Sequence, residues 1–162
     1  MRIILQRVTD ARVSVDNVVV GEIGTGLVAL VGITNSDTVA DAARLADKTV
    51  AARVFANGDR PFDLPIGSVG GSVLCVSQFT LYGDIRRGNR PSWTDAAGPD
   101  QARTVIDAYV ARMRHHHITV ATGVFGTHMQ LQLQNDGPVT LILESAELSR
   151  PRRELGSPAG AG

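Results

Sequence analysis

The chain has almost no cysteine and no excess charge of either sign. Cys75 is the only cysteine among 162 residues, so an internal disulfide framework and a cysteine-based zinc cluster are both excluded. Because Cys75 lies in the apolar run SVLCVSQF, we expect a buried structural thiol. Sixteen basic residues balance sixteen acidic ones, which argues against a protein that coats long nucleic acid by charge. A protein that grips only the end of a nucleic acid remains compatible with this balance.

Long apolar runs and several common motifs are also missing. No run approaches the ~18–20 residues that a membrane span needs, and the N-terminal apolar stretch is too short for a signal sequence. We therefore expect a cytoplasmic protein with no membrane contact. The sequence has no Walker-type phosphate loop, no HExxH zinc motif and no GxSxG serine elbow. Neither a cofactor nor a metal is expected.

The patterns that are present indicate an α+β fold in a single domain. Residues 1–147 form the expected domain, and residues 148–162, which lack apolar content, are expected to be a disordered tail. Apolar spacing predicts one amphipathic helix over residues 37–54 and a second one beginning at Pro99. The remaining periodic segments predict strands in a mostly antiparallel, barrel-like sheet.

Turn residues divide the predicted strands. Asp16-Asn17 is a two-residue hairpin signal, and residues 27–33 are apolar throughout, which is typical of a central strand covered on both faces. Residues 57–71 are rich in Gly, Pro and Asp and are expected to form a loop. Residues 72–82 return to strand chemistry. Near the end, HMQLQLQ and VTLILES are predicted to pair across the turn NDGPVT, where Pro138 directly after glycine is unusual for a tight hairpin.

Three groups of residues could carry chemistry. The segment SQFTL ends an apolar strand with two hydroxyls and an amide, and polar strand ends are common positions for sites. No base stands beside Ser77 or Thr80 in sequence, so a catalytic triad does not follow. The arginines near Trp93 could contact phosphate while the indole stacks on a base, or could belong to a solvated loop: Arg86, Arg87 and Arg90.

The run of three histidines, His115 to His117, suggests metal binding at first sight. Three successive side chains cannot all point the same way from a helix or a strand, so this run alone makes a poor three-ligand site. The run follows a helix, where protonatable groups suit the carboxyl end. A structural or solvated role is the favoured interpretation.

Several stretches together resemble the D-aminoacyl-tRNA deacylase family. They span Met1 to about Ser145, and the pairing of SQFTL with GPVT about sixty residues later is the most specific. The others include MRIILQRV, GEIGTGLVALVGI, RRGNRPSW and TGVFG. The resemblance implies a homodimeric hydrolase that cleaves the ester between a D-amino acid and the terminal ribose of tRNA, and so recognises the tRNA acceptor end.

The resemblance also assigns roles to residues of this sequence. The reaction centre is the segment Ser77, Gln78, Phe79 and Thr80. The Gly137–Pro138 peptide is implied to be cis and to enter the partner subunit's pocket, with Arg7 holding this motif in orientation. Phe125 and Met129 are implied to line the pocket for the terminal adenosine. Thr80 is either a nucleophile or a positioning residue; we favour positioning, with the ribose 2′-hydroxyl assisting and the protein stabilising an oxyanion.

An energetic argument supports selection by backbone. Sparing the abundant L-aminoacyl-tRNA by roughly 10³–10⁴ requires about 4–5.5 kcal/mol, whereas an apolar pocket that judges a methyl group yields only ~1–3 kcal/mol. A rigid Gly-Pro backbone can reject an L side chain by collision. Glycine has no side chain to reject, so glycyl-tRNA is expected to be cleaved too.

The sequence departs from the family's pattern in two places. Phe62-Asp63 stands where a Met-Asn pair is expected, which leaves any side-chain contact from this loop open, and His128 stands where an acidic residue is common. The alternative function is a non-catalytic, dimeric RNA- or protein-binding module of the same fold, in which SQFT and GPVT only build the interface.

Overall fold

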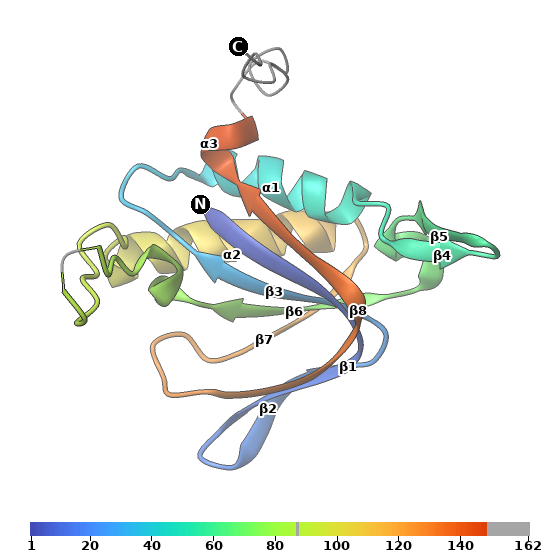
Figure 1. Cartoon of the computed structure of the whole chain (residues 1–162), viewed down its shortest axis with the longest axis horizontal. Coiled ribbons are helices and arrows are strands. Elements are labelled where there is room, and N and C mark those ends of the chain that lie inside the picture. Colours follow the sequence, from blue (N-terminus) through green and yellow to red (C-terminus); the bar gives the residue numbers. More distant parts are fainter. Residues whose placement is uncertain (87, 149–162) are drawn as a thin grey trace, which may run out of the picture.

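A computed structural model describes residues 1–86 and 88–148 and shows a curved sheet with helices on one side (Figure 1). Leu148 is thus the only residue of the tail predicted for 148–162 that is described. The helices and strands are β1 Arg2–Val15, β2 Val18–Ile23, β3 Gly26–Gly32, α1 Val39–Ala51, β4 Phe55–Asn57, β5 Arg60–Leu64, β6 Ser72–Ser77, α2 Pro99–His115, β7 Thr119–Thr122, β8 Gln130–Glu144 and α3 Ser145–Leu148.

The main sheet is mixed but mostly antiparallel, as predicted. Its strands run in the order β2-β1-β3-β6-β7, and β8 pairs with β1. The contacts of β1 with β2, β3 and β8 are antiparallel, whereas β3–β6 and β6–β7 are parallel. The sheet curls until β2 meets β7, since a Cβ on Gly21 would stand 2.7 Å from the carbonyl oxygen of Thr122. Glycine at position 21 therefore permits the barrel-like shape.

Strand alternation divides the core into two clusters. Neighbouring side chains of a strand point to opposite faces, so Leu27 and Ala29 of β3 pack under the helices while Val28 packs inside the curled sheet. On β6, Cys75 belongs to the helix side and Leu74 to the inside. The prediction that residues 27–33 form a central strand covered on both faces is confirmed.

Both predicted helices are present and begin as the sequence indicates. Thr38 caps α1 in a capping box with Asp41, and Pro99 occupies the first turn of α2. The predicted hairpin at Asp16-Asn17 is confirmed by positive φ angles of 49° and 64°, which a two-residue turn of this kind requires. The short helix α3 was not predicted.

The predicted hairpin across NDGPVT is wrong. Residues 130–144 form one strand, β8, and both of its halves pair with β1 rather than with each other. The reason is the length of β1, whose 14 residues offer a continuous edge to both halves. Two register shifts were not predicted: the first, between Gln6 and Val8, accommodates Asp136 to Val139 of β8, and the second, between Val8 and Asp10, leaves Thr9 as an extra residue on β1.

Two other boundaries also differ from the prediction. The segment 57–71, expected to be a loop, contains strand β5 and a 3₁₀ turn at Ile66–Val69. The strand expected over residues 72–82 ends at Ser77, and Phe79–Tyr82 forms a second 3₁₀ turn. β6 ends there because its ladder with β3 stops at the Val31–Ser77 pair, near the end of β3.

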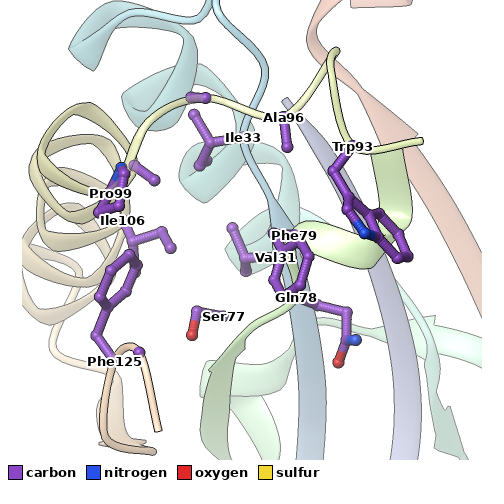
Figure 2. Close-up of a pocket in the computed structure, with 13 residues that line it drawn as sticks. Val31, Ile33, Ser77, Gln78, Phe79, Trp93, Ala96, Pro99, Ile106 and Phe125 are labelled. Carbon is purple, nitrogen blue, oxygen red and sulfur yellow. The ribbon is translucent and has the colours of Figure 1, made fainter. Parts of the chain in front are cut away.

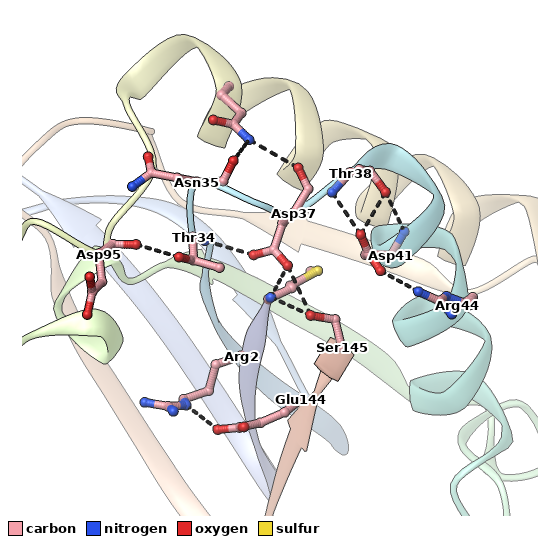
Figure 3. Close-up of polar contacts among 12 residues, drawn as sticks. Arg2, Thr34, Asn35, Asp37, Thr38, Asp41, Arg44, Asp95, Glu144 and Ser145 are labelled. Atoms are coloured by element: carbon pink, nitrogen blue, oxygen red, sulfur yellow. Dashed lines mark hydrogen bonds and ion pairs between the residues drawn. The ribbon is translucent and has the colours of Figure 1, made fainter. Parts of the chain in front are cut away.

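A buried carboxylate, Asp37, joins the start of α1 to the beginning of β1 and the end of β8, which lie side by side (Figure 3). The α-amino group of Met1 donates to Asp37 and lies 2.6 Å from the Ser145 hydroxyl, which in turn donates to Asp37 over 3.0 Å. The amide N–H of Thr34 donates to the same carboxylate over 2.7 Å. None of the helices in residues 1–86 and 88–148 is both long enough and apolar enough to cross a membrane.

Candidate functional site

The polar end of β6 opens toward the helices. Because Cys75 faces the helix side, alternation places Ser77 on the same side, toward α2. Gln78 then leaves the strand, although its N–H still donates to the carbonyl of Val31 over 2.8 Å. The following 3₁₀ turn, Phe79–Tyr82, presents Phe79 and Thr80 to solvent. Ser77 to Thr80 thus form a rim that carries three polar side chains and the exposed ring of Phe79.

A cavity of about 340 Å³ adjoins this rim (Figure 2). Figure 2 shows Phe125 and Ile106 on one side, Phe79 and Trp93 on the other, and the Ser77 hydroxyl between them. Phe79 and Trp93 meet edge to face, with ring centroids 5.2 Å apart and planes 72° apart. Apart from Ser77 and Gln78 the lining is apolar, which suits a flat, stackable group such as a nucleobase.

A second, smaller cavity of about 270 Å³ adjoins Ser77, Gln78 and Phe79 from the sheet interior and is lined by Met129. The two residues implied for the adenosine pocket therefore line different cavities: Phe125 lines the larger cavity and Met129 the smaller one. Gly126 borders both. The absence of a side chain at Gly123 leaves space for the Met129 side chain, since a Cβ on Gly123 would stand 2.5 Å from the methionine sulfur.

The hydroxyls of the rim have no base beside them. Gln78 donates its side-chain amide to the Thr80 hydroxyl. In residues 1–86 and 88–148, no histidine or carboxylate bonds the hydroxyl of Ser77 or Thr80. Burial raises the pKa of the Cys75 thiol to about 12, so this nearby sulfur stays protonated and unreactive, as its apolar surroundings predicted.

The Gly137–Pro138 peptide is cis, as the resemblance implied, and its neighbours hold it closely. Arg7 donates to the carbonyl of Asp136 over 3.0 Å and forms an ion pair with its carboxylate at 2.9 Å. The side-chain amide of Asn135 donates to the carbonyls of Arg7 and Val139, over 2.8 and 3.2 Å. A Cβ on Gly137 would meet the Asn135 amide oxygen at 2.4 Å, so a larger residue there would have to displace this hydrogen-bonded side chain.

Within one chain the two motifs lie apart. Ser77 is level with Val31 and hence with Ile3 of β1, whereas Asn135 is level with Val8, five positions further along β1. At about 3.3 Å per residue this is ~17 Å along the strand alone, before the three-strand offset across the sheet. Figure 1 shows the head of β6 and the bend of β8 at opposite ends of the sheet.

Among the other residues singled out in the sequence, Arg86 and Asp63 have ion-pair partners. Arg86 pairs with Asp84, and hydrogen bonds from Arg86 lower the pKa of this carboxyl to about 2. Trp93 lines the larger cavity, Arg90 is exposed, and Arg87 lies outside the described residues. Asp63 is held by Arg53 and Asn57, which gives the Phe62-Asp63 departure a role within the β4–β5 hairpin.

The histidine run does not converge on one point. His115 ends α2, His116 contacts Asp47 of α1 over 2.6 Å, and His117 turns away with a φ of 60°. Hydrogen bonds from Arg112 and then His116 lower the pKa of Asp47 to about 2. No group of three or more His, Cys, Asp or Glu in the described part of the chain is placed to hold a metal ion.

The sequence did not reveal which residues form the wall opposite Ser77. Pro99, Ala102 and Ile106 belong to the apolar face of α2, and that periodicity predicts a core position and not a cavity wall. No sequence signal separates the two, because both require the same apolar side chains at the same spacing.

Comparisons with known proteins agree on one family. The family model described as D-Tyr-tRNA(Tyr) deacylase matches residues 4–144. A D-aminoacyl-tRNA deacylase of Chloroflexus aurantiacus is 51% identical over 94% of this chain and 96% of its own length. One of Bacillus licheniformis is 52% identical over 90% of this chain and 99% of its own.

Two solved structures share the fold. One, named c-Myc DNA Unwinding Element Binding Protein, is 33% identical, with a TM-score of 0.82 over 89% of this chain and 98% of its own. The other, described as a probable eukaryotic D-amino acid tRNA deacylase, is 16% identical with a TM-score of 0.74, over 88% of this chain and 97% of its own, and supports the fold alone.

Proposed function

The chain belongs to the D-Tyr-tRNA(Tyr) deacylase family and is therefore a hydrolase of the aminoacyl-tRNA ester bond. We propose that it frees D-amino acids from tRNA at Ser77–Thr80. In this proposal, Gly137–Pro138 of a second copy completes the site. The observation that carries this proposal is the polar rim of Ser77 to Thr80, which borders an apolar cavity and has no side-chain base among the described residues.

The reaction proposed here needs no protein nucleophile. Water attacks the ester carbonyl carbon, the bond to the ribose 3′ oxygen breaks, and that oxygen receives a proton, so the products are the free amino acid and tRNA with its 3′-hydroxyl. The neighbouring ribose 2′-hydroxyl can relay the proton. The N–H groups of Phe79 and Thr80 begin the 3₁₀ turn, where the first N–H groups lack partners within the turn. They are the proposed donors to the developing oxyanion.

The apolar cavity is the proposed place for the terminal base. Phe79, Trp93 and Phe125 present three aromatic rings, and stacking of one base on an aromatic ring contributes about 1–3 kcal/mol. Met129 in the adjoining cavity would then contact the ribose or the base edge. This arrangement leaves the ester at the rim, where Ser77 and Gln78 border both cavities.

Chirality is proposed to be read by main chain. Arg7 and Asn135 tie down the residues around Gly137–Pro138, so this segment cannot retreat from an L side chain. Collision with such a backbone can supply the about 4–5.5 kcal/mol that a soft pocket cannot. The α-amino group of the substrate would be captured by the carbonyls of this segment, while a D side chain points outward.

The same geometry supports the proposal that a second copy of the chain takes part. Because the levels of Ser77 and Asn135 are ~17 Å apart along the strand direction within one chain, we expect Gly137–Pro138 to act at the rim of another copy. Two copies related by a two-fold axis can exchange these segments, each completing the other's site. An exchange of Gly137–Pro138 between two copies would thus explain how two motifs that lie apart in one chain can form one site.

The decisive experiment compares three esters. The full chain is incubated with D-tyrosyl-tRNA, L-tyrosyl-tRNA and glycyl-tRNA, and the remaining ester is followed over time. We expect hydrolysis of the D-tyrosyl and glycyl esters, with the L ester cleaved roughly 10³-fold more slowly or less. Cleavage of D-tyrosyl-tRNA with complete resistance of glycyl-tRNA would rule out steric selection at the α-carbon.

The second candidate is a non-catalytic nucleic-acid-binding or protein-binding module. It is favoured by one observation, because the 33%-identical solved structure bears the name of a DNA-element binding protein. If a folded dimer cleaves none of the three esters yet binds uncharged nucleic acid, this second function replaces the first.

A further inference from the structure

A third cavity, of about 360 Å³, shares Ser77, Ile106 and Phe125 with the apolar cavity proposed for the base. It is bounded by one side of α2, by the end of β6 and by residues 122–125. Unlike the apolar cavity it is charged, because Arg103, Asp107 and Arg114 line it. Phe125 therefore separates an apolar compartment from a charged one, and both compartments reach Ser77.

Helical spacing brings the three charges to one face. Positions 103, 107 and 114 are four and seven residues apart, so their side chains line up along α2. The guanidinium of Arg103 lies over the Phe125 ring, 4.7 Å from its centroid. Arg114 donates one N–H to the carbonyl of Val120 over 3.0 Å.

Neither arginine is neutralised within the described part of the chain. No carboxylate there forms an ion pair with Arg103 or Arg114, whereas Arg112 on the same helix is paired with Asp47. Two guanidinium groups and one carboxylate leave a net charge of +1 in the cavity. A single phosphodiester carries one negative charge, so the cavity matches one phosphate group.

We propose, on the basis of the function proposed above, that Arg103 and Arg114 bind the phosphodiester on the 5′ side of the terminal adenosine. A base stacked beside Phe125 places its own ribose near Ser77 and its 5′ phosphate within reach of the next compartment. Guanidinium groups bind phosphate through several N–H donors of fixed geometry. Stacking on Phe125 holds Arg103 in position before the substrate arrives.

This assignment explains how a chain with no net charge can hold a polyanion. Phosphate contacts fix position along a nucleic acid. One locally positive compartment beside the reaction centre orients the acceptor end, without the broad basic surface that would bind any nucleic acid. Asp107 limits this compartment to one excess charge.

The test uses two small esters that differ by one phosphodiester. One is 3′-O-(D-tyrosyl)adenosine, and the other is the same ester carrying a 5′-(methyl phosphate). For the unmodified chain we expect a KM about tenfold lower for the phosphorylated ester, the range of a charge-assisted hydrogen bond. In Arg103→Met and in Arg114→Met, this ratio should fall toward one. Arg103→Lys should recover part of it, because the charge is kept and the planar fork is lost.

A matched control removes a positive charge elsewhere. Lys48 is exposed on α1, and Lys48→Met should keep the tenfold ratio. A ratio that stays at ten in both arginine variants, including the case in which both esters weaken equally, overturns the phosphate assignment. Failure of the unmodified chain to cleave either ester or D-tyrosyl-tRNA would instead overturn the proposed function itself.

Discussion

The two parts of the proposed site are built in opposite ways. Ser77 to Thr80 stand at a strand end and continue into a short 3₁₀ turn whose side chains are largely exposed. Gly137–Pro138 stands within a 15-residue strand, with Arg7 and Asn135 bonded around it. The first region presents polar groups to an open cavity, and the second presents fixed main chain.

This difference matches the demands of the two proposed tasks, ester hydrolysis and chiral selection. Hydrolysis of an activated ester needs a positioned substrate and a few donors, and the substrate brings its own 2′-hydroxyl. Discrimination between substrates that differ only in configuration at the α-carbon needs a surface that does not adapt, because any retreat of the backbone lowers the energetic penalty on the wrong epimer. We therefore expect changes around Gly137 to be more damaging than changes of side chains at the rim.

The strongest test of this contrast is Gly137→Ala. The added Cβ would stand 2.4 Å from the Asn135 amide oxygen, and Asn135 is tied by two hydrogen bonds. We expect kcat/KM for D-tyrosyl-tRNA to fall by about 10²-fold or more, since displacement of a positioning group by about 1 Å has such effects. Gly24→Ala is the control, because its Cβ would meet nothing within 4 Å. Equal activity of the two variants would contradict the idea of a fixed backbone.

Arg7→Met should mainly reduce selectivity. The variant loses the hydrogen bond and ion pair to Asp136 and the hydrogen bond to the carbonyl of Val54, so the Gly-Pro segment gains freedom. We expect the ratio of D- to L-tyrosyl-tRNA cleavage to fall roughly tenfold, the effect of about 1.4 kcal/mol. Arg12→Met is the matched control, because Arg12 lies on the same strand and donates a hydrogen bond to Gln132 of β8. A selectivity unchanged in Arg7→Met would remove this residue from the proposed mechanism.

Thr80→Ala distinguishes positioning from nucleophilic attack. The variant loses one hydroxyl and its hydrogen bond from Gln78, and we expect kcat to fall by less than about tenfold. Single-turnover hydrolysis of D-tyrosyl-tRNA, with binding measured separately, provides the comparison. Complete loss of turnover with intact binding would make Thr80 the nucleophile and would reverse the contrast between the two regions.

The smallest effect is expected remote from both regions. Asp47 bonds Arg112 and His116 between α1 and α2, and its pKa of about 2 in the folded chain lies below the ordinary value of 3.8. Its stabilising contribution is therefore complete above about pH 4 and is lost as the pH falls from 3.8 toward 2. Because the carboxyl is 43% exposed, we expect at most about 1 kcal/mol.

Thermal unfolding of the unmodified chain and of Asp47→Asn, measured from pH 7 to pH 2, tests this expectation. The two curves should converge in acid, while deacylase activity at pH 7 stays the same in both. A larger loss of selectivity here than in Arg7→Met would show that the Gly-Pro segment is not the selective element.

The turns and helix starts could be predicted from the sequence because they are determined by residues close together in the chain. The helix start at Pro99 and the hairpin turn at Asp16-Asn17 each depend on neighbouring residues alone. The error at NDGPVT has the opposite cause. Whether β8 turns back or continues depends on β1, which lies more than a hundred residues away in sequence.

The site shows the same division. The identity of SQFT and GPVT came from the resemblance, whereas their separation along β1 and the charged compartment beside Phe125 depend on tertiary packing. Arg103 and Phe125 are 22 positions apart, and only the fold of α2 against residues 122–125 brings guanidinium and ring together. No local pattern carries that information.

Strand β1 also constrains which insertions and deletions the protein can tolerate in evolution. Its residues between Ile3 and Val8 set the spacing between the level of Ser77 and the level of Asn135. Losing one residue there would turn every following side chain to the opposite face, and losing two would shift the levels by about 7 Å. Insertions and deletions should therefore be absent from this stretch in homologues that keep the activity. They should be found instead in the turn between β4 and β5.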